Sequence, residues 1–303
     1  MTMLTLLILA AQLHPPPPVQ AQNWEKVFDV TTPGSWLAAI WAGNNGEWVA
    51  GGKNVIVDRI NSAVRVTRID GRAAMAISEN RRGVFAVGTH GTIWNIAKAE
   101  VRLEHQTRPT SQRRRRDPDL FFSLVEGEDG GERGLIAVGS NPRFSPAAGK
   151  WREFMDAKTA PRRAQEMLYA STIPRPPSCA GVTWIAFAGS NNSGLMACGD
   201  RRAFRVTDLA VGALPNLPKN CASIARAAVS AARLVISCDR GVLYELDGVG
   251  WRLIPSPFQI EAIALSPACL WAAAAKAVWR NCLPPTKASS EECHHPDLPL
   301  RKQ

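Results

Sequence analysis

The sequence predicts an all-β fold in which short four-stranded sheets stand around an axis, a β-propeller with six blades. One hairpin pattern recurs along the chain, and a strand of small residues precedes most of its copies. Helical periodicity is nearly absent, and only residues 162–171 favour a short helix. A repeat of four short strands is typical of propellers.

The recurring hairpin is a strand that ends in a small residue, a tight turn, and a strand that in most copies carries an aromatic side chain. Its copies span residues 48–57, 84–94, 135–144, 195–204, 234–244 and 270–279. The turns begin at Gly52, Gly88, Gly139, Gly199, Asp239 and Ala274, which we take as anchors. Five or six residues later stand Val57, Trp94, Phe144, Phe204, Tyr244 and Trp279. Glycine or aspartate at an anchor indicates a turn with unusual dihedral angles.

Strands of small side chains precede the hairpins, and we expect them to lie innermost, where the sheets crowd around the axis. They span residues 37–43, 73–78, 184–189, 224–230 and 260–266. Fourth strands that begin with tryptophan follow two hairpins, at Trp151 and Trp251. Six anchors predict six blades, while the interval between Gly139 and Gly199 leaves room for a seventh.

The stretch WEKVF at residues 24–28 resembles the two tryptophan-led fourth strands, yet no strand of its own unit precedes it. The last unit, near residues 258–282, has three strands and no fourth. We therefore expect residues 24–28 to pair with the last unit and close the ring. Closure would hide sheet edges that otherwise invite aggregation.

The N-terminus predicts export. Leu4 to Leu13 form an apolar run too short to span a bilayer, and Val19-Gln20-Ala21 is a small-residue cleavage site. The alternative is a leader that stays attached, since no Lys or Arg precedes the apolar run. The predicted domains are a signal peptide over 1–21, a propeller over 22–282 and a polar tail over 283–303. No transmembrane segment is expected after leader removal, so the mature protein should be periplasmic or extracellular.

The cysteines also favour export, because disulfides persist in oxidising compartments. Two stretches that open with Cys-Ala repeat one hairpin, and facing positions of a hairpin can be bridged. The expected pairs are Cys179 with Cys198, Cys221 with Cys238, and Cys269 with Cys282, which leaves Cys293 over. Buried free thiols are the alternative. Zinc is not expected, because the chain has no Cys-x-x-Cys pair.

The stretches VGTHGTIW (87–94), CDRGVLYEL (238–246) and DGVGW (247–251) resemble a known family. They are similar to photosystem II assembly-factor propellers, within the class of BNR or Asp-box repeats. The full Asp-box pattern, Ser-x-Asp-x-Gly-x-Thr-Trp, is not intact, and His90 stands where the aspartate would be. The resemblance implies an exported propeller used for protein binding or assembly. It carries over no binding-site residue and does not imply a photosynthetic role.

The formal net charge of +10 makes anionic partners plausible. Arg113, Arg114, Arg115 and Arg116 form the densest positive segment, expected in an exposed loop between the second and third units. The planar guanidinium group of arginine can donate two parallel hydrogen bonds to a carboxylate or a phosphate, so this loop is the candidate contact for an anionic partner. The alternatives are a solvated insertion and a site of proteolytic nicking. Nucleic acid is not an expected partner of an exported protein.

We predict an exported module that binds or assembles with a protein partner, acidic if the arginine loop takes part. No catalytic residue, cofactor or metal is expected, and there is no Gly-x-Ser-x-Gly elbow. The alternative function is a secreted glycan-active hydrolase of the sialidase kind, which needs arginines, a tyrosine nucleophile and acidic partners. Tyr169 beside Arg162, Arg163 and Glu166 would be its site, whereas Tyr244 stands at the repeated aromatic position and should pack in the core.

Overall fold

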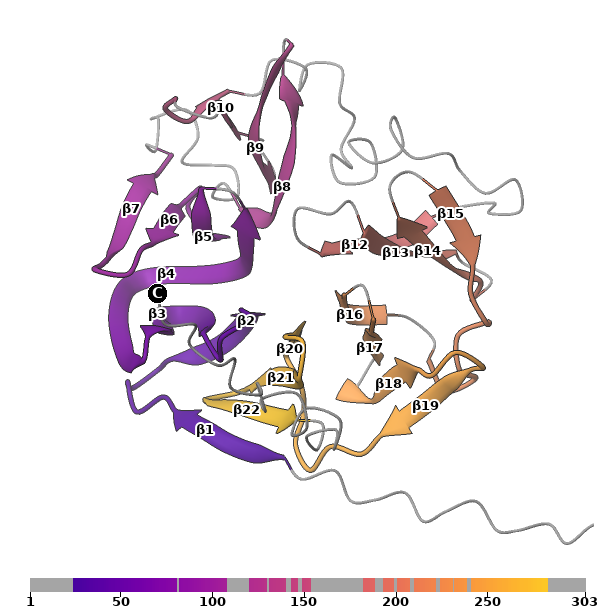
Figure 1. Ribbon diagram of the computed structural model, residues 1–303. Helices are drawn as coiled ribbons and strands as arrows, with labels where there is room; N and C mark the ends of the chain where they lie inside the picture. The colour runs from indigo at the N-terminus through magenta and orange to yellow at the C-terminus, as the bar shows by residue number, and fades with distance from the viewer. Residues whose placement is uncertain are drawn as a thin grey trace, which may run out of the picture.

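A computed structural model describes residues 24–80, 82–107, 120–129, 131–139, 143–146, 149–153, 182–188, 193–198, 201–207, 210–221, 224–230, 232–238 and 241–282. Every regular element in these ranges is a β-strand, as predicted. Figure 1 shows the sheets standing around a central axis.

Three four-stranded sheets are built from consecutive strands. The first contains β8 (Phe121–Asp129), β9 (Glu132–Gly139), β10 (Arg143–Pro146) and β11 (Arg152–Glu153). The second contains β12 (Val182–Ala188), β13 (Ser193–Cys198), β14 (Ala203–Thr207) and β15 (Ala210–Ala213). The third contains β16 (Ile224–Val229), β17 (Leu234–Cys238), β18 (Leu243–Leu246) and β19 (Trp251–Ile254). Each sheet is antiparallel and holds one copy of the predicted hairpin.

A fourth four-stranded sheet joins the two ends of the described chain. It contains β20 (Ala262–Leu265), β21 (Cys269–Ala274) and β22 (Ala277–Cys282), and its outer strand is β1 (Glu25–Asp29). Glu25 pairs with Arg280 in the register, and the Arg280 guanidinium donates to both Glu25 carboxylate oxygens at 2.8 and 3.0 Å. The expected pairing of the N-terminal strand with the last unit is therefore present, while closure of the complete ring stays a prediction.

The remaining sheet has six strands and carries two copies of the hairpin. It contains β2 (Trp36–Ala42), β3 (Trp48–Asn61), β4 (Ala63–Asn80), β5 (Gly83–Gly88), β6 (Ile93–Ile96) and β7 (Val101–His105).

Two long strands in this sheet reverse or bend within their length. A Cβ at Gly51 would lie 3.8 Å from Cγ1 of Ile56, so β3 folds back between them, at Asn54 with φ 64°. β4 pairs with β3 through its first half and with β5 through its second, and Gly71 between them has φ 70°. Because the strands form five sheets, the count of six blades stays a prediction.

The anchor glycines serve a different purpose from the one expected. Gly52, Gly88 and Gly139 do not have positive φ. Instead, a Cβ at each would overlap a backbone carbonyl oxygen at the beginning of an innermost segment, that of Trp36, Ala73 and Leu120 respectively. The glycine is therefore required by a close backbone approach and not by the turn itself.

The register also corrects two anchors. Gly52, Gly88 and Gly139 pair with the first or second residue of an innermost strand, immediately before a bulge in that strand. In the later sheets, Cys198 and Cys238 occupy that position, so the assignment of Gly199 and Asp239 was wrong by one residue. Cysteine stands here where the earlier units have glycine.

The hydrophobic core lies between successive hairpin units and not inside a single unit. Along β5, Val84 and Ala86 pack in a cluster with β3 and β4, whereas Phe85 and Val87 pack against β8 and β9. Along β17, Leu234 and Ile236 likewise face the preceding sheet, and Val235 faces the following one. Alternate residues point to opposite faces of a strand, so a strand covered on both faces must be apolar throughout. This explains the unbroken apolar runs of the second strands.

The repeated aromatic position is part of this core. Trp94, Phe144, Phe204 and Tyr244 are each at most 8% exposed. Trp279 is half-buried and stacks on Phe258, with ring centroids 4.5 Å apart. The packing role predicted for Tyr244 is confirmed.

Candidate functional site

Several residues predicted to have a function lie outside the described residues. These are the leader, the arginine loop Arg113–Arg116, the Tyr169 group with Arg162, Arg163 and Glu166, and Cys179 and Cys293. The roles assigned to them from the sequence therefore stay predictions.

Two of the three expected cysteine pairs are present in the structure. Cys269 and Cys282 are bonded and face each other directly in the register of β21 and β22, as predicted. Cys221 is bonded to Cys238, with Cα atoms 5.2 Å apart. Cys221, however, does not begin the innermost strand. It lies in the link three residues before β16, and Cys238 pairs with Ile224 instead.

The position of Cys221 gives its disulfide a clear structural role. In the earlier units, the link that enters an innermost strand comes so close to the anchor glycine that a Cβ there would overlap a backbone carbonyl oxygen. Here the same link is held to the anchor position by a covalent bond. Cys198 pairs with Val182 in the same register in which Cys238 pairs with Ile224, and each cysteine partner expected from the sequence lies three residues upstream. The matching register supports the predicted Cys179–Cys198 pair.

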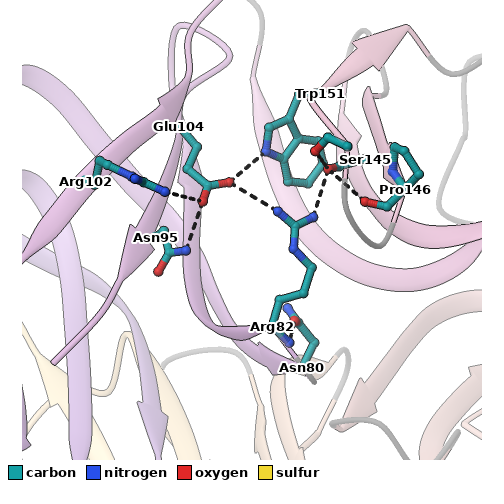
Figure 2. Close-up of polar contacts among 9 residues, drawn as sticks. Asn80, Arg82, Asn95, Arg102, Glu104, Ser145, Pro146 and Trp151 are labelled. Carbon is teal, nitrogen blue, oxygen red and sulfur yellow. Dashed lines mark hydrogen bonds and ion pairs between the residues drawn. The ribbon is translucent and has the colours of Figure 1, made fainter.

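A polar cluster centred on Glu104 joins the six-stranded sheet to the sheet of β8–β11 (Figure 2). Glu104, on β7, accepts hydrogen bonds from Asn95 Nδ2 at 2.9 Å and Trp151 Nε1 at 3.2 Å. Arg82, in the turn before β5, has Nη2 3.6 Å from Glu104 Oε2, and its Nη1 donates to Ser145 Oγ at 2.8 Å. Arg82 therefore lies between the two sheets and binds to both.

The surroundings of Glu104 stabilise the ionised form of its carboxyl group. Burial would raise the pKa of Glu104, but hydrogen bonds from Asn95 and Trp151, together with the charge of Arg82 and a hydrogen bond from Arg102, outweigh it and lower that pKa. A general acid at neutral pH would need the opposite shift. The cluster is therefore suited to holding two sheets together and not to proton transfer.

The tryptophans that lead the fourth strands share one contact. Trp151 Nε1 donates to Glu104, Trp251 Nε1 donates to the Pro215 carbonyl at 3.0 Å, and Trp24 Nε1 donates to the Pro255 carbonyl at 2.9 Å. In each case the acceptor lies on the last strand of the preceding sheet or in the link just after it. The tryptophan that recurs at the start of these strands thus makes a recurring hydrogen bond to the preceding unit.

The motif DGVGW forms a turn stabilised by its aspartate. Asp247 Oδ1 accepts hydrogen bonds from the backbone N–H groups of Val249 at 3.3 Å and Gly250 at 3.1 Å. The Gly250 bond and then the Val249 bond lower the pKa of Asp247. This aspartate is used to hold the turn that precedes β19, a structural role.

Two kinds of feature are absent from the described residues. Within the described ranges, no three side chains of histidine, cysteine, aspartate or glutamate gather as metal ligands. Helices with the length and apolar character needed to cross a membrane are also absent from the part of the chain that the structure describes.

Comparisons with known proteins support the fold alone. No family model matches the sequence, and no curated protein matches it. Among solved structures, a WD40 β-propeller in the crystal structure of a mitotic checkpoint complex has a TM-score of 0.56 at 11% identity. The match covers 90% of this chain and 99% of that one. The chain is therefore a β-propeller, and the narrower resemblance to photosystem II assembly factors is not supported by this match.

Proposed function

We propose that this protein is an exported propeller that binds a protein partner and serves as a scaffold for its assembly. The observation that carries the proposal is the fold, because it resembles over nearly its full length a propeller that works within a multiprotein complex. Fold alone does not fix function, so the proposal is limited to the class of partner. We also propose, from the sequence motifs alone, that the protein is related to assembly-factor propellers.

The architecture supports this role. The cores lie between successive hairpin units, and tryptophan hydrogen bonds and the Glu104 cluster connect neighbouring units. A scaffold that is held together in this way can present loops in fixed positions, which is where binding residues tend to lie. Export is proposed on the two bonded cysteine pairs, because such pairs persist in oxidising compartments. Binding, and not catalysis, is proposed as the activity.

The test is chemical cross-linking of the native protein in periplasm or culture medium, followed by purification and identification of the attached proteins. We expect one partner to be recovered with the wild type at stoichiometric yield. A variant with Arg113–Arg116 replaced by serine should recover less at low salt and show a flatter salt dependence, because exposed charges act mainly on association. Recovery of no partner from any exported fraction, or hydrolysis of a sialoside by the purified protein, would contradict the proposal.

A further inference from the structure

The turns between second and third strands lie at one end of the sheets, and we name this end the turn face. The described turns are residues 53–54, 89–92, 201–202, 241–242 and 275–276. Each has a residue with left-handed φ: Asn54 (64°), His90 (59°), Arg201 (66°), Gly241 (75°) and Ala275 (47°). The same backbone reversal therefore recurs in the described turns of this face.

Backbone contacts join three of these turns into one continuous arc. The Leu37 N–H donates to the Ala275 carbonyl at 2.6 Å, so the turn at 275–276 lies against the beginning of β2. Trp36 pairs with Lys53, and Lys53 pairs with Ala73. The Thr89 N–H then donates to the Ala73 carbonyl at 3.0 Å. The order along the turn face is therefore 276, 36, 53, 73 and 90.

The side chains along this arc are basic and aromatic. Lys276, Lys53 and His90 are exposed, one on each of three successive turns. Trp36 lies between the two lysines and is 39% exposed, which is unusual for a tryptophan in this fold. Its partner in the register is Lys53, and directly paired residues project to the same side of a sheet. Trp36 is thus open to solvent on the strand position paired with Lys53, and the turn that carries Lys276 lies against the beginning of the same strand.

Acidic residues at the border of the arc favour a short acidic ligand over a long polyanion. Asp29 and Asp70 are exposed near its outer side, and Asp29 is already paired with Lys26 at 3.0 Å. These carboxylates would repel a long uniform polyanion that ran across the face. A short segment can instead place one apolar side chain on Trp36 and acidic groups on the two lysines. Tryptophan is enriched among residues that dominate binding energy.

We propose that Trp36, Lys53 and Lys276 form a docking site for a short acidic segment of a partner protein. The proposal rests on the proposed protein-binding function and names the surface and the chemistry of the partner. Trp36 supplies the apolar contact, and the lysines supply orientation and rate of association. His90 extends the same site along the arc as a hydrogen-bonding group.

The test uses a fluorescein-labelled short peptide rich in glutamate and aspartate with a central leucine, titrated with the full chain and followed by fluorescence anisotropy. Replacing both lysines (K53S with K276S) should weaken binding about tenfold at low salt, which equals a loss of about 1.4 kcal/mol. W36A should weaken it by a similar factor at all salt concentrations, because the lost contact is apolar. A peptide with glutamine and asparagine in place of the acids should bind no better than the double variant.

The matched control is K98S with K150S, which removes the same charge. Lys98 and Lys150 are exposed and lie in or beside turns between third and fourth strands, at the opposite end of the sheets. We expect this control to bind the acidic peptide as the wild type does. Equal affinity for wild type, K53S/K276S and W36A would overturn the proposal, as would binding of heparin in preference to the peptide. Thermal unfolding of each variant verifies that it is folded.

Failure of this site and failure of the proposed function give different results. If the cross-linked partner is still recovered by K53S/K276S and by W36A, the docking site is wrong while the scaffold role stands. If no partner is recovered with the wild type, the scaffold role itself is wrong.

Discussion

Single residues in this propeller are constrained by backbone that approaches them from a neighbouring strand. Gly88 illustrates this, because its missing side chain leaves room for the Ala73 carbonyl at the beginning of the innermost segment of the same unit. The sequence located the glycine repeat correctly but indicated the wrong cause. A turn requirement and a close backbone approach leave the same signature in a sequence, and only the register separates them.

Replacing Gly88 with alanine should therefore destabilise the protein by about 1–3 kcal/mol, the usual cost of forcing an extra methyl group into a packed site. The control is Gly212→Ala on β15, where an added Cβ meets no heavy atom within 4 Å. That change should be neutral or slightly stabilising. Chemical denaturation of both variants measures the difference, and equal midpoints would show that the close approach is not required.

Glu104 should make stability depend on pH. Its pKa in the folded protein is lowered from the ordinary value of 4.5, so its stabilisation is present above that value and is lost as pH falls through the folded pKa. Glu104→Gln should cost about 1 kcal/mol at neutral pH, because Arg82 loses its charged partner. The difference in the free energy of unfolding between wild type and variant should become smaller at acidic pH.

Urea denaturation at neutral and acidic pH measures this difference, with the exposed Glu79→Gln on β4 as control. A difference that is the same at both pH values would mean that the charge of Glu104 does not stabilise the fold.

At the scale of elements, the hairpin repeat, the innermost strands and the tryptophan-led fourth strands were predictable because each has a periodic pattern. Other strands were missed. β8 carries acidic residues where small ones were expected, and β7 and β15 lack a leading tryptophan. The Glu104 cluster could not be predicted, since Arg82, Glu104 and Trp151 come from separate strands and only the packing of two sheets brings them together.

The disulfides should form as three local pairs. Peptide mapping without reduction should recover Cys179 with Cys198, Cys221 with Cys238 and Cys269 with Cys282, and Cys293 should carry a free thiol. Loss of the Cys221–Cys238 pair in a double serine variant should cost about 3 kcal/mol in the chain-entropy model. A map that links cysteines of different units would contradict the shared register of the two hairpins.

At the scale of the whole molecule, the outer strand of the last sheet comes from the other end of the chain. Deleting residues 24–30 should leave β22 as an open edge, remove the Trp24 hydrogen bond to Pro255 and expose part of the core near Val30. Exposed edges pair with other chains, so the truncated protein should aggregate. Light scattering and thermal unfolding test this, and a truncated protein that melts and dissolves like the wild type would contradict the role of β1.

The pairing of β1 with β22 also sets the order of events when the chain is made. β1 has no partner in its sheet until residues 277–282 have been synthesised. At usual rates of translation this wait lasts tens of seconds. A ribosome-bound fragment therefore cannot complete its last sheet, and a chain that crosses a membrane before folding loses nothing by the delay. The last sheet becomes complete only after residues 277–282 have left the ribosome.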